Sequence, residues 1–444
     1  MQTRFTAEQL TDSATRDSER NLRACVHCGF CLSTCPTYSL LGNELDSPRG
    51  RIYLIKDMLE HDRPATHEVA LHVDRCLSCL SCQTTCPSGV HYQHLIDHAR
   101  EHVEKTYDRP LIDKALRAIL AWILPYPGRF RPVLQAARFF RPLGRFTSGR
   151  LAAMLELAPA RLPKQEAGAR QTFYPAEGKA HARVALLTGC AQRVIAPEIN
   201  NATIRLLTRH GVDVVVPGAS GCCGAIVHHI GKADQARELA LAAIRTWTEE
   251  LDSGGLDAIV VNTSGCGTEI KDYGHMFRDD EVWAEPAQRI SGLARDITEF
   301  AAGLGIKSSV GAGLTVAYHS ACSLQHGQKV TAQPKALLAA AGFAVRDVPE
   351  GHLCCGSAGT YNLLQPEIAD QLRERKLANI ARVAPDIIAA GNIGCITQLA
   401  GGTGTPVVHT VELLDWATGG PLPEALARKG YENEIPSMGL GEAS

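Results

Sequence analysis

Short apolar runs rich in β-branched residues recur through the second half of the chain and predict buried strands. These runs are Val184–Leu187, Val212–Val216, Ala258–Val261, Leu314–Tyr318 and Ile387–Ile388. Longer stretches of helical character separate them, among them Ala233–Glu249 and Pro366–Val383. Strand alternating with helix predicts a small parallel sheet in each half of this region, with ligands bound just beyond the carboxyl ends of the strands.

The first hundred residues follow a helical pattern instead. Ser47 and Pro48 form a typical helix start, with serine as the N-cap and proline at the first helical position. Ile52, Ile55 and Leu59 then fall on one face of the predicted helix.

Four histidines share one face of a later helix, at spacings of three, four and four residues. They are His91, His94, His98 and His102. Such a face can hold a metal or a haem, but helical spacing alone is a weak ligand signal. We therefore expect a solvated or partner-facing stripe.

An amphipathic and strongly basic segment follows, between residues 109 and 170. Its apolar stripe is Leu116, Ile119, Leu120, Ile123 and Leu124. Counting gives 12 Lys and Arg against three acidic residues, a net charge of +9, whereas the whole chain carries −2. Aromatic residues are interleaved with arginines through residues 122–146. The segment either meets an anionic membrane surface or a partner subunit, or packs as a basic helical hairpin on its own protein.

Two quartets of cysteine with one spacing lie in the helical N-terminal part. Each reads C-x2-C-x2-C-x3-C and is followed by proline: Cys25, Cys28, Cys31 and Cys35, then Cys76, Cys79, Cys82 and Cys86. This is the bacterial two-cluster ferredoxin run, in which the fourth cysteine ligates the other cluster. We therefore predict one [4Fe–4S] cluster on Cys25, Cys28, Cys31 and Cys86, and a second on Cys76, Cys79, Cys82 and Cys35. Two zinc knuckles are the alternative, but no histidine stands at a ligand position.

A second set of cysteines repeats with its surroundings in the two predicted sheets. Each repeat has one cysteine, then a Cys-Cys-Gly triplet and a last cysteine: Cys190, Cys222, Cys223 and Cys266, then Cys322, Cys354, Cys355 and Cys395. Thiolates beside small residues suit a cluster, because backbone amides can approach the sulfurs closely. A zinc held by four cysteines, a vicinal dithiol that works by disulfide exchange, and plain packing remain open.

These patterns together predict an α+β multidomain protein. Residues 1–108 form an α-helical ferredoxin domain with two [4Fe–4S] motifs, and 109–180 form a basic amphipathic linker. Residues 181–305 and 306–444 form two tandem α/β cysteine-rich repeats. The length of 444 residues is consistent with two or three domains. The 45% hydrophobic content is ordinary for a soluble globular protein.

Composition and motifs exclude several functions. The net charge of −2 gives no general attraction to nucleic acid. No G-x-G-x-x-G opens a helix, residues 224–232 do not fit a phosphate-binding loop, and Ser220 lacks the G-x-S-x-G frame. Residues 1–20 are polar, without a signal-peptide pattern, and no long apolar run occurs. We therefore expect a cytoplasmic electron carrier, peripheral at most on the inner membrane, with no site for hydride removal from an organic substrate.

Several segments then indicate a family. They are residues 23–31 (RACVHCGFC), 35–38 (CPTY), 44–56 (ELDSPRGRIYLIK), 74–77 (DRCL) and 85–90 (TCPSGV). With the two Cys-Cys-Gly repeats, they closely resemble the iron–sulfur subunit of bacterial glycolate oxidase. The resemblance implies an FAD-containing partner that oxidises glycolate to glyoxylate, beside a second, flavin-subunit-like protein. This chain would pass the electrons singly toward a respiratory acceptor, a membrane quinone. Arg49 and Arg51 would then either raise a cluster potential or form ordinary surface pairs.

The repeats are shared more widely, which keeps other functions open. Iron–sulfur subunits of anaerobic glycerol-3-phosphate dehydrogenase, lactate-utilisation proteins and heterodisulfide reductases also carry them. Heterodisulfide-reductase repeats end in C-x2-C, but Thr263 and Asn392 stand here in place of the first of those cysteines. We therefore expect at most four ligands per repeat, which argues against a thiol–disulfide enzyme. A scaffold with zinc-bound repeats is a third alternative.

Overall fold

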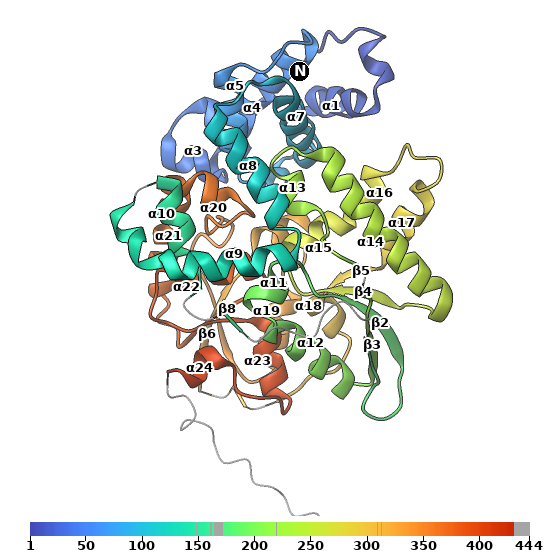
Figure 1. Ribbon diagram of the computed structural model, residues 1–444, viewed down its shortest axis with the longest axis vertical. Helices are drawn as coiled ribbons and strands as arrows, with labels where there is room; N and C mark the ends of the chain where they lie inside the picture. The colour runs from blue at the N-terminus through green and yellow to red at the C-terminus, as the bar shows by residue number, and fades with distance from the viewer. Residues whose placement is uncertain are drawn as a thin grey trace, which may run out of the picture.

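In the computed structural model, an all-helical N-terminal region lies above two α/β units that stand side by side (Figure 1). The structure describes residues 1–147, 149–159, 162–163, 172–218, 220–308, 310–311 and 313–429. Residues 148, 160–161 and 164–171 of the predicted linker and residues 430–444 of the second predicted repeat lie outside this range. Among the described residues, no helix combines the length and apolarity needed to cross a bilayer.

Seven helices form the N-terminal region. They are α1 (Ser13–Ala24), α2 (Phe30–Ser33), α3 (Pro36–Leu41), α4 (Pro48–Glu60), α5 (His67–Asp74), α6 (Ser81–Thr85) and α7 (Tyr92–Thr106). The predicted helix start is confirmed, because the Ser47 hydroxyl accepts a hydrogen bond from the Gly50 amide at 2.9 Å. Ile52, Ile55 and Leu59 are buried, as their spacing predicts, and α4 and α5 connect the two cysteine loops.

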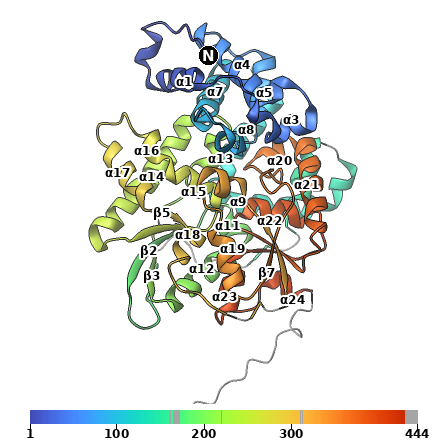
Figure 2. The ribbon, with the colours of Figure 1, turned by 180° about the vertical axis from the view of Figure 1, so that it is seen from behind.

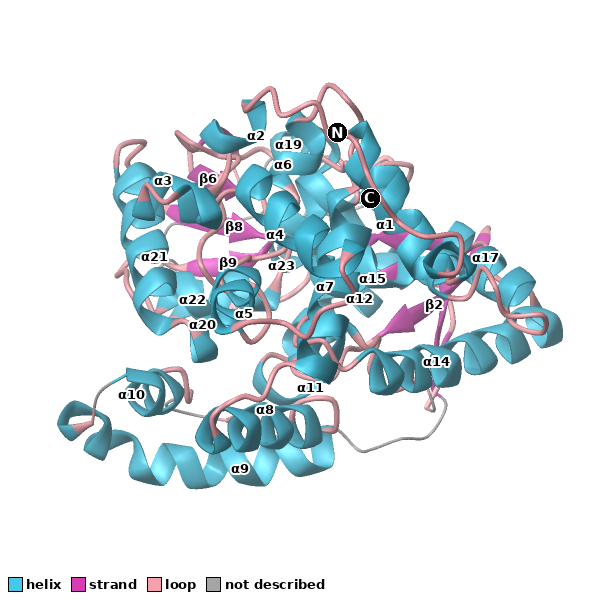
Figure 3. Ribbon diagram, turned by 90° about the horizontal axis from the view of Figure 1, so that it is seen from above, coloured by secondary structure: helices cyan, strands magenta, loops and turns pink. Residues whose placement is uncertain are grey.

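Three helices of the basic segment form a layer along one side of the molecule (Figure 3). They are α8 (Leu111–Ile123), α9 (Pro127–Phe140) and α10 (Gly149–Glu156). α8 is anchored by buried arginines: Arg117 pairs with Asp74 at 2.8 Å and with Asp113 at 3.2 Å. α10 is tied to α8 by the pair between Arg150 and Asp113 at 2.7 Å.

Both predicted sheets are present, on opposite sides of the molecule (Figure 2). The first has the order β1-β3-β2-β4-β5, from β1 (Thr172–Tyr174), β2 (Ala182–Leu187), β3 (Val212–Val216), β4 (Ala258–Val261) and β5 (Ala294–Asp296). The second has the order β7-β6-β8-β9, from β6 (Thr315–His319), β7 (Ala344–Asp347), β8 (Ile387–Ala390) and β9 (Val407–His409). All these pairings are parallel except that of β1. Apart from β1, the two orders match strand for strand, as expected of an internal repeat.

The two repeats share one hydrophobic core. Val184 and Leu186 of β2 and Val316 and Tyr318 of β6 belong to the same buried cluster. Between the sheets, this cluster includes residues of α12 (Glu198–Arg209), α18 (Ile297–Ala301), α19 (Gln333–Ala340) and α23 (Thr410–Ala417). The opposite face of each sheet has a core of its own, as the two-sided burial of parallel strands requires.

The remaining helices complete the repeats. In the first repeat they are α11 (Gln192–Ile195), α13 (Ala225–His228), α14 (Ala233–Gly254), α15 (Ser264–Lys271), α16 (Tyr273–Met276) and α17 (Ala284–Leu293). In the second they are α20 (Tyr361–Leu364), α21 (Pro366–Ala381), α22 (Ile393–Ala400) and α24 (Glu424–Ala427).

Candidate iron–sulfur centres and the cysteine-rich rim

The two ferredoxin loops have the same unusual backbone. His27 and Gly29 in the first loop, and Ser78 and Leu80 in the second, all have left-handed φ angles, between 51° and 85°. These residues occupy matching places in the two C-x2-C-x2-C runs. Left-handed residues within a short segment turn successive amides and side chains toward one centre, at a cost for residues other than glycine. The same strained backbone in both loops indicates that each loop binds the same kind of ligand.

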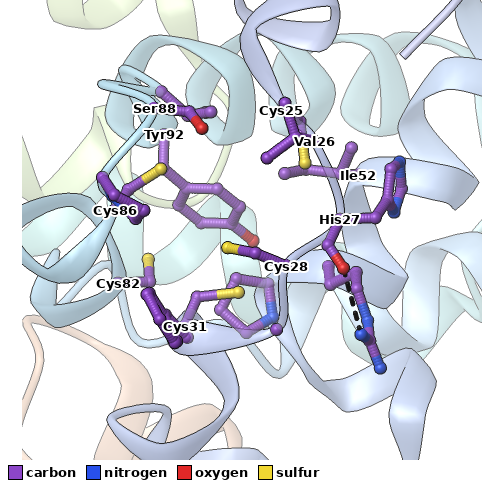
Figure 4. A pocket seen from close by; sticks show the side chains of 16 residues that line it. Cys25, Val26, His27, Cys28, Cys31, Ile52, Cys82, Cys86, Ser88 and Tyr92 are labelled. Atoms are coloured by element: carbon purple, nitrogen blue, oxygen red, sulfur yellow. Dashed lines mark hydrogen bonds between the residues drawn. The ribbon is translucent and has the colours of Figure 1, made fainter.

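The cysteines of the first run surround one space together with the end of the second run. Cys25, Cys28, Cys31, Cys82 and Cys86 line a single cavity, and their sulfur atoms lie around it (Figure 4). Cys28 is the most exposed of the five, whereas Cys25 and Cys82 are buried. The arrangement brings Cys86 to the first loop, where crossed ligation requires it.

The other predicted set also lies together. Cys82 has Cys79, Cys76 and Cys35 as its electrostatic neighbours, and Cys35 and Cys76 likewise act on Cys79. Burial and the neighbouring Cys25 raise the pKa of the Cys31 thiol to about 11, and burial also raises the pKa values of Cys79 and Cys82 well above the usual thiol value. Free thiols at these places would stay protonated at neutral pH, whereas a metal takes them as thiolates. The thiol sets and loop backbones therefore fit iron–sulfur clusters.

Arginines hold these loops in place. Arg51 is 1% exposed, donates to the His72 carbonyl at 2.6 Å and lies 4.0 Å from the Cys35 sulfur. It is therefore no surface residue, but buried Asp46 lies 3.6 Å away and offsets its charge. Arg49, by contrast, forms an ordinary ion pair with Glu44 at 2.7 Å.

Arg100 is a supporting residue that the sequence did not reveal. Its guanidinium donates to the Cys76 carbonyl at 2.6 Å and to the Ser78 hydroxyl. An arginine within a helix carries no sequence signal of such a contact.

The eight repeat cysteines gather just beyond the strand ends, as predicted. The Cys190 and Cys222 sulfurs are 3.5 Å apart, and those of Cys322 and Cys354 are 3.8 Å apart. In each repeat the glycine after the cysteine pair donates its amide to sulfur, at 3.5 Å from Gly224 and 3.4 Å from Gly356. Both glycines have φ near +90°, and a Cβ at either would lie within 3 Å of a helix carbonyl. The Cys-Cys-Gly triplet therefore needs glycine for close approach.

The two residues that replace a fifth cysteine have other tasks. Thr263 precedes α15 and donates to the Gln192 side chain at 2.6 Å. Asn392 holds the matching place before α22 and accepts from the Gly394 amide at 3.1 Å. Both side chains therefore take part in hydrogen bonds within the protein.

The second ferredoxin loop touches the second repeat directly. Leu77 and Cys79 share a buried apolar cluster with Cys354 and Tyr361, and Cys322 packs against it. The Tyr361 hydroxyl donates to the Arg75 carbonyl at 3.1 Å. The thiols of the ferredoxin loops and of the second repeat thus form one connected group.

A cavity of about 370 Å³ lies between the helical layer and the two repeats. Its walls are apolar side chains of α8, α9 and α10, including Leu120, Ile123, Phe130 and Leu134. Leu77 and Ser78 of the second ferredoxin loop reach it. Six repeat cysteines also line it: Cys190, Cys223, Cys266, Cys322, Cys354 and Cys395. Its volume and apolar walls are typical of a small-molecule site.

The expectation of a solvated or partner-facing histidine stripe is wrong for His94 and His98 of α7. His94 bonds to Asp272 of the first repeat at 2.9 Å and stacks on His275. His98 bonds to the Ser18 hydroxyl at 2.7 Å. The face packs α7 against its own protein, because neighbouring elements offer hydrogen-bond partners that no sequence spacing displays.

The basic segment packs on its own protein at its start and exposes side chains further along. Arg109 and Arg117 are buried in ion pairs, so the start of the segment packs on its own protein. α9 instead turns apolar and basic side chains outward, with Phe139 79% exposed and Arg138 also exposed.

The fold and thiol sites define the class of protein: an iron–sulfur protein with a two-cluster helical domain and two cysteine-rich repeats. Residues 21–90 match the model of a 4Fe-4S dicluster domain, and residues 184–271 and 316–400 match that of a cysteine-rich domain. The chain is 40% identical, over 94% of its length and 99% of the relative, to the glycolate oxidase iron–sulfur subunit of Escherichia coli. It therefore belongs to the family of glycolate oxidase iron–sulfur subunits. The predicted architecture is confirmed, and the chain binds [4Fe–4S] clusters.

Two further comparisons are more distant. Lactate utilization protein A of Bacillus licheniformis is 29% identical over 52% of this chain and 99% of its own length. A crystal structure of a hypothetical protein from Helicobacter pylori matches with a TM-score of 0.53 at 9% identity, over 94% of this chain and 74% of that one. The second likeness shows the fold alone.

Proposed function

We propose that this chain is the electron-transfer subunit of a glycolate oxidase complex. It receives electrons from an FAD-containing partner that oxidises glycolate to glyoxylate, assisted by a second flavin-subunit-like protein. It passes them toward a membrane quinone at the cytoplasmic face of the inner membrane. The observation that best supports this proposal is a series of neighbouring thiols that extends from exposed Cys28 to the apolar cavity. When bound, the two clusters supply one-electron chemistry between two-electron partners.

The ligands proposed for the first cluster are Cys25, Cys28, Cys31 and Cys86, and those for the second are Cys76, Cys79, Cys82 and Cys35. All four thiols of the first set line one cavity, which Cys82 also reaches, and Cys35 acts on both Cys79 and Cys82 of the second set. These two observations support the crossed assignment. The repeat cysteines are not assigned to either cluster, although Cys322 and Cys354 pack beside Cys79.

The exposed side of the first cluster site is the proposed entry for electrons. Val26 and Phe30 are each more than half exposed within the loop of Cys28, as is Tyr53, whose ring lies 4.5 Å from that of His27. Exposed apolar side chains at a redox centre are typical of a surface that a partner subunit covers.

The apolar cavity is the proposed exit. Leu77 and Ser78 connect it to the second ferredoxin loop, and α8 and α9 form its cover. The outward apolar and basic side chains of α9 suit an anionic lipid surface, from which a quinone could enter. Two electrons and two protons convert the quinone to the quinol.

Removal of this chain alone tests the assignment. We expect extracts of such cells to lose glycolate-dependent reduction of a short-chain quinone, while lactate- and glycerol-3-phosphate-dependent rates persist. Re-expression of the wild-type chain is the control. An intact glycolate rate would contradict the proposal, and loss with lactate or glycerol 3-phosphate would identify the alternative complex.

Neutralising two exposed arginines near the end of α9 should weaken membrane binding. Each basic residue near an anionic surface contributes about 1 kcal/mol, so R138Q/R141Q should reduce vesicle affinity by about 30-fold. Co-sedimentation of the purified chain with phosphatidylglycerol-containing vesicles measures this. The control is R346Q/R382Q, which removes two exposed charges from the second repeat. Equal binding by both double variants and the wild type would argue for packing without membrane contact.

A further inference from the structure

A buried histidine without any hydrogen-bond partner stands at the end of β6. His319 is 1% exposed, and neither ring nitrogen has a partner among the described residues. Burying an imidazole without a partner for either nitrogen costs free energy, so such a group is rare and calls for an explanation. A metal ion is one partner that accepts a neutral imidazole nitrogen.

The side chains beside His319 are thiols. A ring nitrogen of His319 and the sulfurs of Cys355 and Cys395 all lie within 4.8 Å of one another. The other thiols of this repeat, Cys322 and Cys354, have sulfurs 3.8 Å apart, and Cys354 is the chain neighbour of Cys355. Zinc–sulfur bonds of about 2.3 Å and zinc–nitrogen bonds of about 2.0 Å bring tetrahedral ligand atoms to this kind of separation.

The first repeat lacks this arrangement. The residue three positions before its first cysteine, at the end of matching strand β2, is Leu187. A second replacement accompanies it: buried Lys376 of α21 lies near the thiols of Cys354 and Cys355. Gly356 lies close to the Ala369 carbonyl of α21, and Gly224 lies close to the Ala236 carbonyl of α14. Lys376 follows Ala369 by the same number of residues as Ala243 follows Ala236, so Ala243 is the matching residue of the first repeat. Among the described residues, the group of an imidazole and two thiols close enough to hold one metal ion therefore lies in the second repeat, with a lysine near its thiols.

We propose that the second repeat binds a single zinc ion through His319, Cys355, Cys395 and one thiol of the Cys322–Cys354 pair. Mixed nitrogen and sulfur donors in a tetrahedral set favour zinc. The closeness of three ligand atoms suits one ion rather than an iron–sulfur cubane, whose thiolates stand farther apart. Lys376 offsets the negative charge that thiolates bring to a buried site.

Metal content of the full chain tests the proposal. After anaerobic purification, elemental analysis should find about one zinc per chain beside about eight irons. H319L should lose most of the zinc and keep the iron. H319C, which restores a ligand, should recover the zinc, and this outcome separates ligation from a merely structural role. H210L, which replaces a half-buried histidine of the first repeat, should leave the zinc unchanged.

Cobalt substitution gives a second measurement that does not depend on activity. The d–d absorption of cobalt bound to the wild-type chain should differ from that of H319C, because nitrogen is exchanged for sulfur. Equal zinc in H319L and the wild type would overturn the proposal, as would iron in place of zinc or a zinc-free wild type with full ferredoxin iron. None of these measurements uses glycolate, so they stand apart from the electron-transfer assignment.

Discussion

C86A should lose the same cluster as C28A, although Cys86 belongs to the second cysteine run. Each variant should drop about four of the eight ferredoxin irons and lose glycolate-dependent quinone reduction. C35A should in turn match C79A. The physical reason is that Cys86 lies in the cavity of the first loop, while Cys35 acts on Cys79 and Cys82.

Electron paramagnetic resonance of the reduced proteins distinguishes the two clusters, and iron analysis counts them. T84S, a change within the second loop at a residue without a thiol, is the control and should keep both signals. If C86A instead matched C79A, each run would bind its own cluster and crossed ligation would be wrong.

D46A should destabilise the N-terminal helical region by about 3 kcal/mol, the cost of leaving a buried cation without its partner. Asp46 is fully buried and accepts from His72 at 2.8 Å and Arg75 at 2.9 Å, with Arg51 at 3.6 Å. Its backbone carbonyl also accepts from Thr37 at 2.6 Å. Urea unfolding, followed by the loss of iron–sulfur absorbance, measures the change.

The matched control is D57A, which removes the exposed ion pair between Asp57 of α4 and Arg63. Pairs of that kind contribute little, so its unfolding free energy should change by less than about 1 kcal/mol. Similar losses in both variants would mean that Asp46 does not hold Arg51 in place.

The strands that the sequence predicted well are those buried on both faces. β3 and β4 begin and end where the predicted runs Val212–Val216 and Ala258–Val261 do. β4 is buried at every position, and a parallel strand covered on both faces is apolar throughout. β7 was missed: it lies at a sheet edge with Arg346 and Asp347 exposed, so it has no apolar run. β5 and β9 have only three residues each and give no periodic signal.

The candidate site residues likewise fall into those that the sequence predicted and those that depend on the fold. Cysteine spacing alone was sufficient to predict the two clusters, since three proposed ligands of each are close together in sequence. His319 was not found, because a single histidine at the end of an apolar strand reads as part of that strand. Comparison of the two repeats could have found it, since Leu187 stands at the matching place. Arg51 was noticed, but its burial against Asp46 depends on a fold that brings distant residues together.

The core shared by the two repeats makes them a single unit in unfolding as well as in shape. Side chains of β2 and β6 and of the helices between the two sheets belong to one buried cluster. Neither sheet can therefore open without exposing apolar surface of the other. A ligand that binds one repeat therefore raises the free energy of unfolding of both repeats. A chain that fails to load its second repeat would be loosened as a whole, which gives cellular proteases a means to remove incompletely assembled subunits.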